Sequence, residues 1–229
     1  MAELIGGLRI ERIRENVARV RTEIAAAVHR SPVTRVAQER SGGVELLAAI
    51  KYVARDELPL LAEAGIELVG ENRAQELRAK HETHGELFEW DFIGQLQSRR
   101  VKEIVPYVRL IHSVASDSAL RELDRHRALA RPELRLLVEV NIAEEPGKAG
   151  VEPDRVGEFI ARSPMPVAGL TTMPPLAAEP DDNRRWFALL RQLADEHALE
   201  HLSMGTSQDY AVAVEEGATI VRIGTSLYS

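Results

Sequence analysis

The 229-residue sequence contains no cysteine, and this absence removes several kinds of chemistry at once. A chain without thiols forms no disulfide framework and offers no thiolate as a metal ligand or a nucleophile. The absence is compatible with the reducing cytosol without being specific to it.

Long apolar segments are also missing. No stretch approaches the roughly 18 apolar residues of a membrane span. The N-terminus is charged from Glu3 onward and lacks the apolar core of a signal peptide. The formal net charge of -7 disfavours a general nucleic-acid binder, which needs a cationic face, but leaves room for a local basic pocket. We therefore expect a soluble, cytoplasmic protein that binds neither membranes nor nucleic acids.

The sequence lacks the short motifs of several common sites. Neither GxGxxG opening a βαβ unit nor GxxxxGK[ST] is present, so the dinucleotide and P-loop signatures are absent. The seven histidines form no HExxH pair, and His81 and His84 lie on a polar helix end that we expect to be solvated. No GxSxG nucleophile motif appears. We expect no metal site.

Short apolar runs dominate the sequence after residue 43. Before them, apolar residues three or four positions apart from Ile10 to Val28 predict a helix, and the polar segment from Arg30 to Gly43 predicts a loop. The runs themselves show little alternation, which is typical of strands buried on both faces of a parallel sheet. They are Val44–Ile50, Ile66–Val69, Trp90–Ile93, Leu110–Val114, Leu134–Ile142, Val167–Leu170, His201–Met204 and Thr219–Ile223.

Helical patterns separate these runs, and the alternation predicts right-handed βαβ units in an α/β fold. Eight strands are the number that closes a barrel. We therefore favour a (β/α)8 TIM barrel with an additional N-terminal helix over an open, doubly wound sheet. No shift in composition marks a second domain, so we expect residues 1–229 to form a single domain. The helical patterns include Leu58/Leu61/Ala62, Val101/Ile104/Val105/Val108, Ala119/Leu120/Leu123, Val156/Phe159/Ile160 and Trp186/Leu189/Leu190/Leu193.

Polar residues follow the predicted strands. In a parallel barrel the carboxyl ends of all strands meet at one rim, where barrel enzymes place their chemistry. We expect these residues to converge there. They are Lys51, Gly70-Glu71-Asn72-Arg73, Gly94-Gln95, His112-Ser113, Asn141, Thr171-Thr172, Gly205-Thr206-Ser207 and Gly224-Thr225.

Lys51 directly follows the apolar run LLAAI. Partial burial at a strand end lowers the pKa of an amine, and a neutral amine can attack an aldehyde to form a Schiff base. The alternative is a lysine that simply extends into solvent, and this alternative is favoured when Lys51 is considered alone.

Two features near the C-terminus suggest a phosphate site. Ser207 precedes a helical pattern that stops at Gly217, so it is a candidate N-cap, and a helix N-terminus attracts phosphate. Gly224 and Thr225 follow the last strand, where glycine lets backbone N–H groups approach an anion. Barrels often bind phosphate with their last two loops. Plain helix capping is the alternative for Ser207.

Arg222 lies inside the apolar strand TIVRIG and needs an acceptor there, because an unpaired buried charge is too unfavourable. A carboxylate such as that of Glu71 is one candidate. An aromatic nitrogen of a bound ligand is the other.

Six segments together resemble the YggS/PROSC family, the pyridoxal 5′-phosphate (PLP) homeostasis proteins. The resemblance runs from about Val44 to the C-terminus, and GENRAQE and the last segment are its most specific parts. The segments are AAIKYVARDELPLLAEAGIELVGENRAQE, FIGQLQSRRVKEIV, IHSVAS, VNIAEEPGKAGV, GLTTMPP and LSMGTSQDYAVAVEEGATIVRIGTSLYS.

The resemblance implies a barrel of the alanine-racemase type, PLP fold type III, with PLP near the rim. Ile50 and Tyr52 stand where the family commonly has serine and threonine, and GQLQSRR replaces the more usual GHLQSNK. The matched positions imply a set of PLP-binding residues. These are Lys51 as the Schiff-base lysine, Asn72 near the cofactor ring, Ser207, Gly224 and Thr225 as phosphate ligands, Ser203 as a further phosphate candidate, and Arg222 at the pyridine nitrogen.

An arginine at the pyridine nitrogen weakens the ring as an electron sink, although racemases of related fold work with one. Those racemases take a second acid/base, a tyrosine, from an extra C-terminal domain that no segment here resembles. We therefore expect a PLP carrier for apo-enzymes, without efficient catalysis. A weak PLP-dependent racemase is the runner-up. A barrel enzyme that acts on a phosphorylated substrate without PLP, with Lys51 as its reactive lysine, is the third hypothesis.

Lys148 lies in a predicted loop after the fifth strand. It is a candidate for assisting PLP entry or holding a second PLP, and a solvated loop lysine is the alternative. For the oligomeric state we lean towards a monomer.

Overall fold

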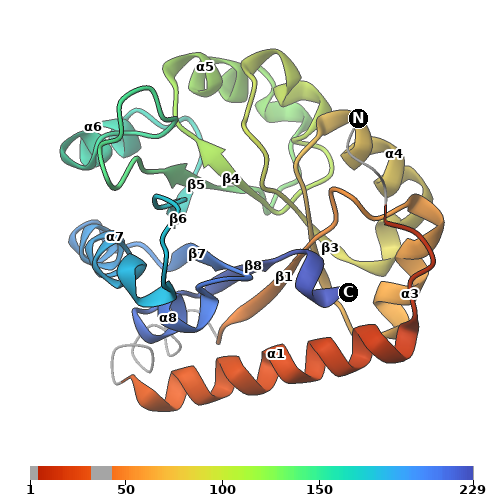
Figure 1. Ribbon diagram of the computed structural model, residues 1–229. Helices are drawn as coiled ribbons and strands as arrows, with labels where there is room; N and C mark the ends of the chain where they lie inside the picture. The colour runs from red at the N-terminus through yellow and green to blue at the C-terminus, as the bar shows by residue number, and fades with distance from the viewer. Residues whose placement is uncertain (1–4, 32–42, 229) are drawn as a thin grey trace.

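The computed structural model describes residues 5–31 and 43–228, and eight short strands form where the eight apolar runs predict them. Each strand pairs in parallel with the next, and β8 also pairs with β1. The sheet therefore closes (Figure 1), so the barrel is confirmed and the open sheet is wrong. The strands are β1 (Glu45–Ala49), β2 (Leu68–Glu71), β3 (Glu89–Phe92), β4 (Leu110–Val114), β5 (Arg135–Glu139), β6 (Val167–Thr171), β7 (His201–Thr206) and β8 (Ile220–Ile223).

The predicted helices form, with one exception. The pattern from Val101 to Val108 gives only the short 3-10 helix η3 (Ser98–Glu103) followed by turns, because Pro106 lacks the N–H that an α-helix would need there. Within the described residues, no helix combines the length and hydrophobicity that crossing a bilayer requires. The α-helices are α1 (Ile10–Arg30), α3 (Leu58–Glu63), α4 (Ala74–His84), α5 (Asp117–Arg125), α6 (Val156–Ala161), α7 (Arg184–Glu196) and α8 (Tyr210–Glu215).

The additional N-terminal helix α1 is confirmed. It buries Ile13, Val17, Val20, Ile24 and Ala27, which repeat every three or four residues along one face. This face packs against α8 and α3, so α1 runs along the outside of the barrel (Figure 1). The loop predicted from Arg30 to Gly43 falls mostly on residues 32–42, which lie outside the described residues.

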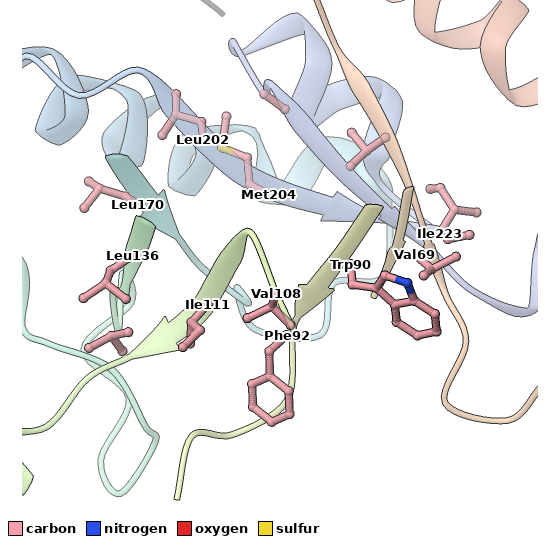
Figure 2. Packing of buried hydrophobic residues seen from close by; sticks show 14 of the residues in the cluster. Val69, Trp90, Phe92, Val108, Ile111, Leu136, Leu170, Leu202, Met204 and Ile223 are labelled. Carbon is pink, nitrogen blue, oxygen red and sulfur yellow. The ribbon is translucent and has the colours of Figure 1, made fainter. Parts of the chain in front are cut away.

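Two apolar layers hold the barrel together, one on each face of the sheet. Because successive strand residues point to opposite faces, neighbours such as Leu47 and Ala48 belong to different layers. The larger layer lies between the strands and the helices and includes Val69, Trp90, Phe92, Ile111, Leu136, Leu170, Leu202 and Ile223 (Figure 2). The smaller layer fills the inside of the barrel and consists of Leu47, Leu68, Leu110, Leu137, Ala168 and Ile220.

Inside the barrel, the apolar layer is followed by a polar layer nearer the carboxyl ends of the strands. Two residues after Leu110, Leu137 and Ile220, the same inward positions hold His112, Glu139 and Arg222. This change from apolar to polar packing marks the end of the barrel at which a ligand could bind.

Candidate cofactor site at the carboxyl ends of the strands

The barrel brings the predicted site residues to one rim. Lys51 follows β1, Asn72 follows β2, Ser207 follows β7, and Gly224 and Thr225 follow β8. Ser203 and Arg222 belong to β7 and β8 themselves and lie deeper, below the rim. The convergence expected from the strand ends is therefore present.

Lys51 is half-buried at the end of β1. Its ammonium nitrogen lies 4.5 Å from the centre of the Tyr52 ring, a cation–π contact. Among the described residues, no carboxylate forms an ion pair with Lys51. An amine without an anionic partner is available to react with an aldehyde once it loses its proton.

Asn72 carries an unused acceptor. Its side-chain oxygen Oδ1 is buried and has no hydrogen-bond partner within the described structure. The loop after β3 packs closely on this residue, since a Cβ atom at Gly94 would lie 2.1 Å from the backbone oxygen of Asn72. Buried polar atoms normally have partners, so Asn72 indicates a donor supplied by a ligand.

Ser207 lies in a tight turn between β7 and α8. Gly205 opens this turn with φ +89°, where a Cβ atom would lie 2.6 Å from the Cβ of Ala213. Asp209 closes it by accepting a hydrogen bond from the backbone N–H of Thr206 at 2.7 Å. As a result α8 begins at Tyr210 with Asp209 before it, so the prediction of Ser207 as the N-cap is wrong.

Ser207 instead contacts the loop after β8. Its hydroxyl oxygen accepts hydrogen bonds from the backbone N–H of Gly224 at 3.3 Å and from the hydroxyl of Ser226 at 3.0 Å. A Cβ atom on Gly224 would have no atom within 4 Å, so the space beside this glycine is open. The last two loops thus place hydroxyl groups next to open space, where a small anion could bind, and we call this group of residues the Ser207 seat (Ser207, Gly224, Thr225 and Ser226).

Arg222 is buried among neutral acceptors. Its guanidinium donates to Thr171 Oγ1 at 2.8 Å, to the backbone oxygen of Ser203 at 2.7 Å and to that of Thr172 at 2.9 Å. Burial lowers the pKa of Arg222 to about 10, so it stays protonated at neutral pH. Glu71 pairs with Lys80 at 2.7 Å instead, so the carboxylate considered as a partner of Arg222 is wrong.

Ser203 connects Arg222 to a polar network inside the barrel. Its fully buried hydroxyl accepts from Arg222 at 2.6 Å and lies 2.9 Å from Nδ1 of His112. The other ring nitrogen of His112, Nε2, lies 3.0 Å from the carboxylate of Asp91. Because a carboxylate only accepts, Nε2 carries the proton and Nδ1 accepts the Ser203 hydroxyl proton. Ser203 therefore faces Arg222 and the barrel interior, away from the Ser207 seat.

Arg109 completes the network at the opposite end of the barrel. It donates to Asp91 at 3.0 Å and to both oxygens of Glu45 at 2.8 Å. Although burial opposes it, the carboxylates of Asp91 and Glu45 raise the pKa of Arg109. A continuous chain of polar side chains thus runs through the barrel and ends on Arg222.

We expect acid to destabilise the fold through His112. Burial lowers the pKa of His112 below its ordinary value of 6.5, so as pH falls through 6.5 the unfolded chain binds this proton first. Folding stability is then lost. At a pH one unit below 6.5, a single histidine accounts for a loss of up to about 1.4 kcal/mol. Urea unfolding at pH 7.5 and 5.5 should show a smaller acid loss for His112→Gln than for wild type. Replacing the exposed His29 by glutamine is the control, and equal acid losses in all three proteins would contradict this account.

The sequence analysis did not single out three charged residues, of which Asp91 and Lys80 are buried and Glu139 is half-buried. Asp91 is a charged residue inside the apolar strand WDFIG, which is the same signal that identified Arg222. Lys80 lies three residues after Leu77 on the buried face of α4, where a lysine is unusual. Glu139, whose pKa is raised by burial, ends β5.

The histidine pair is only partly solvated. His81 and His84 are both half-buried, and the His81 ring packs 5.5 Å from that of Trp90 and 4.9 Å from that of Tyr107. The described residues contain no group of three or more acidic, histidine or cysteine side chains placed to hold a metal ion.

Comparison with known proteins identifies the family. The family model described as "Alanine racemase, N-terminal domain" matches residues 9–229. The pyridoxal phosphate homeostasis protein of Aquifex aeolicus is 40% identical over 205 residues, which cover 83% of this chain and 90% of that protein. The chain belongs to the family of pyridoxal phosphate homeostasis proteins. The expected resemblance is thereby confirmed, together with its alanine-racemase type of barrel.

Solved structures of similar sequence support this assignment. PipY of Synechococcus elongatus, solved with PLP bound, matches with a TM-score of 0.74 at 29% identity, covering 95% of this chain and 100% of that chain. A protein of Bifidobacterium adolescentis, described only as unknown, matches with a TM-score of 0.84 at 31% identity, covering 99% and 98% of the two chains. This family's barrel is thus shared over nearly the whole length of the chain.

The rim has the chemistry that PLP requires. An aldehyde needs an amine, which Lys51 offers, and a phosphate needs donors and open space, which the Ser207 seat offers beside Gly224. The unpartnered oxygen of Asn72 and the cationic Arg222 are further polar groups at the same end of the barrel. The residues present therefore fit the cofactor after which the family is named.

Proposed function

We propose that this protein binds PLP at the rim of its barrel and serves PLP homeostasis in the cytoplasm, keeping the reactive aldehyde bound until an apo-enzyme accepts it. One observation carries the proposal: the Lys51 amine, which pairs with no carboxylate of the described residues, and the Ser207 seat share one rim. The relatives, which are named for PLP homeostasis, support it. We propose a single domain acting as a monomer, with PLP and apo-enzymes as its partners.

Each rim residue has a distinct role in this proposal. Lys51 holds the aldehyde as a Schiff base with loss of one water, and Asn72 lies near the ring. Ser207, Gly224 and Thr225 bind the phosphate, and Arg222 faces the pyridine nitrogen. Ser203, which the resemblance suggested as a phosphate ligand, is better placed to hold Arg222 in position, because its hydroxyl bonds to that guanidinium.

A carrier is favoured over an enzyme by the partner of the pyridine nitrogen. Bound PLP supplies an aldehyde and a ring that can act as an electron sink, and the sink is strongest when the ring nitrogen is protonated. Burial lowers the pKa of Arg222 only to about 10, so Arg222 is itself protonated at neutral pH and offers the ring nitrogen an N–H donor and a positive charge. It therefore disfavours a protonated ring nitrogen. A weak racemase remains the second candidate.

The proposal is tested by adding PLP to purified protein and following visible absorption, then mixing the loaded protein with an apo form of a PLP-dependent enzyme. We expect saturable PLP binding, transfer that restores the activity of the apo-enzyme, and no turnover of amino acids by the carrier alone. Robust racemisation would establish the second candidate. Absence of binding at saturating PLP would contradict both and favour a phosphorylated substrate.

Replacing Ser207 with alanine should weaken PLP binding without unfolding the protein. A hydrogen bond to a charged phosphate contributes about 1.5–3 kcal/mol, which corresponds to a loss of affinity of about tenfold or more. Equilibrium dialysis measures this loss. Thr22→Ala, which removes an exposed hydroxyl from α1, is the control and should bind PLP as wild type does. Equal affinities for Ser207→Ala and wild type would remove Ser207 from the phosphate site.

A further inference from the structure

Lys80 is buried almost completely, with 1% of its surface exposed, although it belongs to the otherwise polar helix α4. Lysines are rarely buried to this degree unless they are paired. Its ammonium donates to Glu71 Oε2 at 2.7 Å and to the backbone oxygen of Ile50 at 2.7 Å. One side chain therefore joins the ends of β1 and β2.

These two contacts lie immediately before the two rim residues closest to the proposed ring site. Ile50 precedes Lys51, and Glu71 precedes Asn72. The second oxygen of Glu71, Oε1, accepts the backbone N–H of Asn72 at 2.7 Å and that of Arg73 at 3.1 Å. Lys80 thus holds the backbone next to both rim residues. It bonds directly to Ile50 beside Lys51, and it bonds to Glu71, which in turn holds the backbone of Asn72.

Tyr228 adds a second anchor to the same segment. Its hydroxyl donates to the backbone oxygen of Ala49 at 3.2 Å, so two successive carbonyl groups before Lys51 are held by side chains. Burial, and then the charge of Glu71, raise the pKa of Tyr228, so the hydroxyl keeps the proton that it donates. Side chains thus hold the backbone of the Lys51 segment, while the Lys51 ammonium lies over the Tyr52 ring.

A buried ion pair adds little net stability, because removing both charges from water offsets their attraction. Stability alone therefore does not account for Lys80 and Glu71 at this place. We infer that Lys80 is a positioning residue. Through Ile50 and Glu71 it orients the Lys51 amine towards the aldehyde of PLP and Asn72 towards the PLP ring. This inference rests on the proposed function, since it assumes that Lys51 forms the Schiff base.

The double variant Lys80→Met/Glu71→Gln tests the inference without leaving a buried charge. Glutamine at position 71 keeps an oxygen for the N–H groups of Asn72 and Arg73, so what is lost is the pair of bonds from Lys80 to Ile50 and to position 71. Displacement of a reacting group by about 1 Å can slow a reaction by up to about a hundredfold. We expect the rate at which borohydride-fixable PLP accumulates on Lys51 to fall about tenfold or more, while total PLP bound in equilibrium dialysis falls less than about threefold.

The control is Arg78→Met/Glu82→Gln, which removes an exposed ion pair of 2.7 Å from the same helix and should leave both measurements unchanged. Tyr228→Phe removes only the bond to Ala49 and should also slow adduct formation. If the double variant fails to fold, this single variant provides the test. An unchanged rate in the folded variants, or a parallel fall in rate and total binding, would overturn the inference. Absence of any adduct in wild type would instead defeat the proposed function.

Discussion

Lys51→Ala is expected to abolish the borohydride-fixed PLP adduct and the visible absorption band that accompanies it. Alanine has no amine, so no Schiff base can form at this position. The phosphate donors of the Ser207 seat remain, so weaker, non-covalent PLP binding should persist. The fold should also persist, because Lys51 is only half-buried and substitutions of that kind usually change stability by less than about 0.5 kcal/mol.

Lys102→Ala is the matched control, because it removes an exposed lysine in η3 and should behave as wild type. Intact-mass analysis after borohydride reduction measures the adduct in each protein. Full labelling of Lys51→Ala at a single new residue would contradict the assignment. Partial label on Lys148 in both wild type and Lys51→Ala would instead support the second PLP site considered for that lysine, whose ammonium pairs with Glu145 on the loop after β5.

Arg109→Met should destabilise the barrel by about 3–5 kcal/mol, the usual effect of removing one member of a buried ion pair. Asp91 has no exposed surface, and Arg109 is its charged partner through two hydrogen bonds of 3.0 and 3.3 Å. Methionine preserves much of the side-chain volume but leaves the Asp91 carboxylate with His112 alone. Glu45 loses both of its bonds to the guanidinium as well.

Urea unfolding at neutral pH measures this loss. The control is Arg131→Met, because Arg131 pairs with the half-exposed Glu133 at the surface and pairs of that kind contribute about 1 kcal/mol or less. Similar stability changes in the two variants would mean that the network inside the barrel is not a stabilising element. The folded fraction of Arg109→Met sets how much PLP binding should be lost through unfolding alone. A larger loss of PLP binding would show that the network also holds Arg222 in place.

The barrel could be predicted from the sequence because each strand is a separate local signal. Runs such as Val167–Leu170 are apolar on both sides, and turn residues bound them, so their number and order follow without tertiary information. The rim residues could be predicted in the same way, because a residue such as Lys51 that follows a strand must lie at the rim where that strand ends. The failures were local: Pro106 interrupts a helical pattern, and Asp209 rather than Ser207 precedes α8.

The supporting contacts could not be predicted in the same way. Lys80 and Ile50 are thirty positions apart in sequence, and their contact depends on where α4 packs against the end of β1. The family resemblance implied that Ser203 is a phosphate ligand, yet its side chain bonds to Arg222 and His112 inside the barrel. Periodicity in the sequence indicates which face of a strand or helix a side chain occupies. Its hydrogen-bond partner on that face depends on how the closed barrel brings distant segments together.

The central claim is that PLP is held covalently on Lys51 at the rim. The most direct test is to load the wild-type protein with PLP, reduce it with borohydride, digest it and map the modified peptide by mass spectrometry. We predict one stoichiometric modification, on the peptide that contains Lys51. A modification found elsewhere with Lys51 unmodified, or none at saturating PLP, would contradict the account.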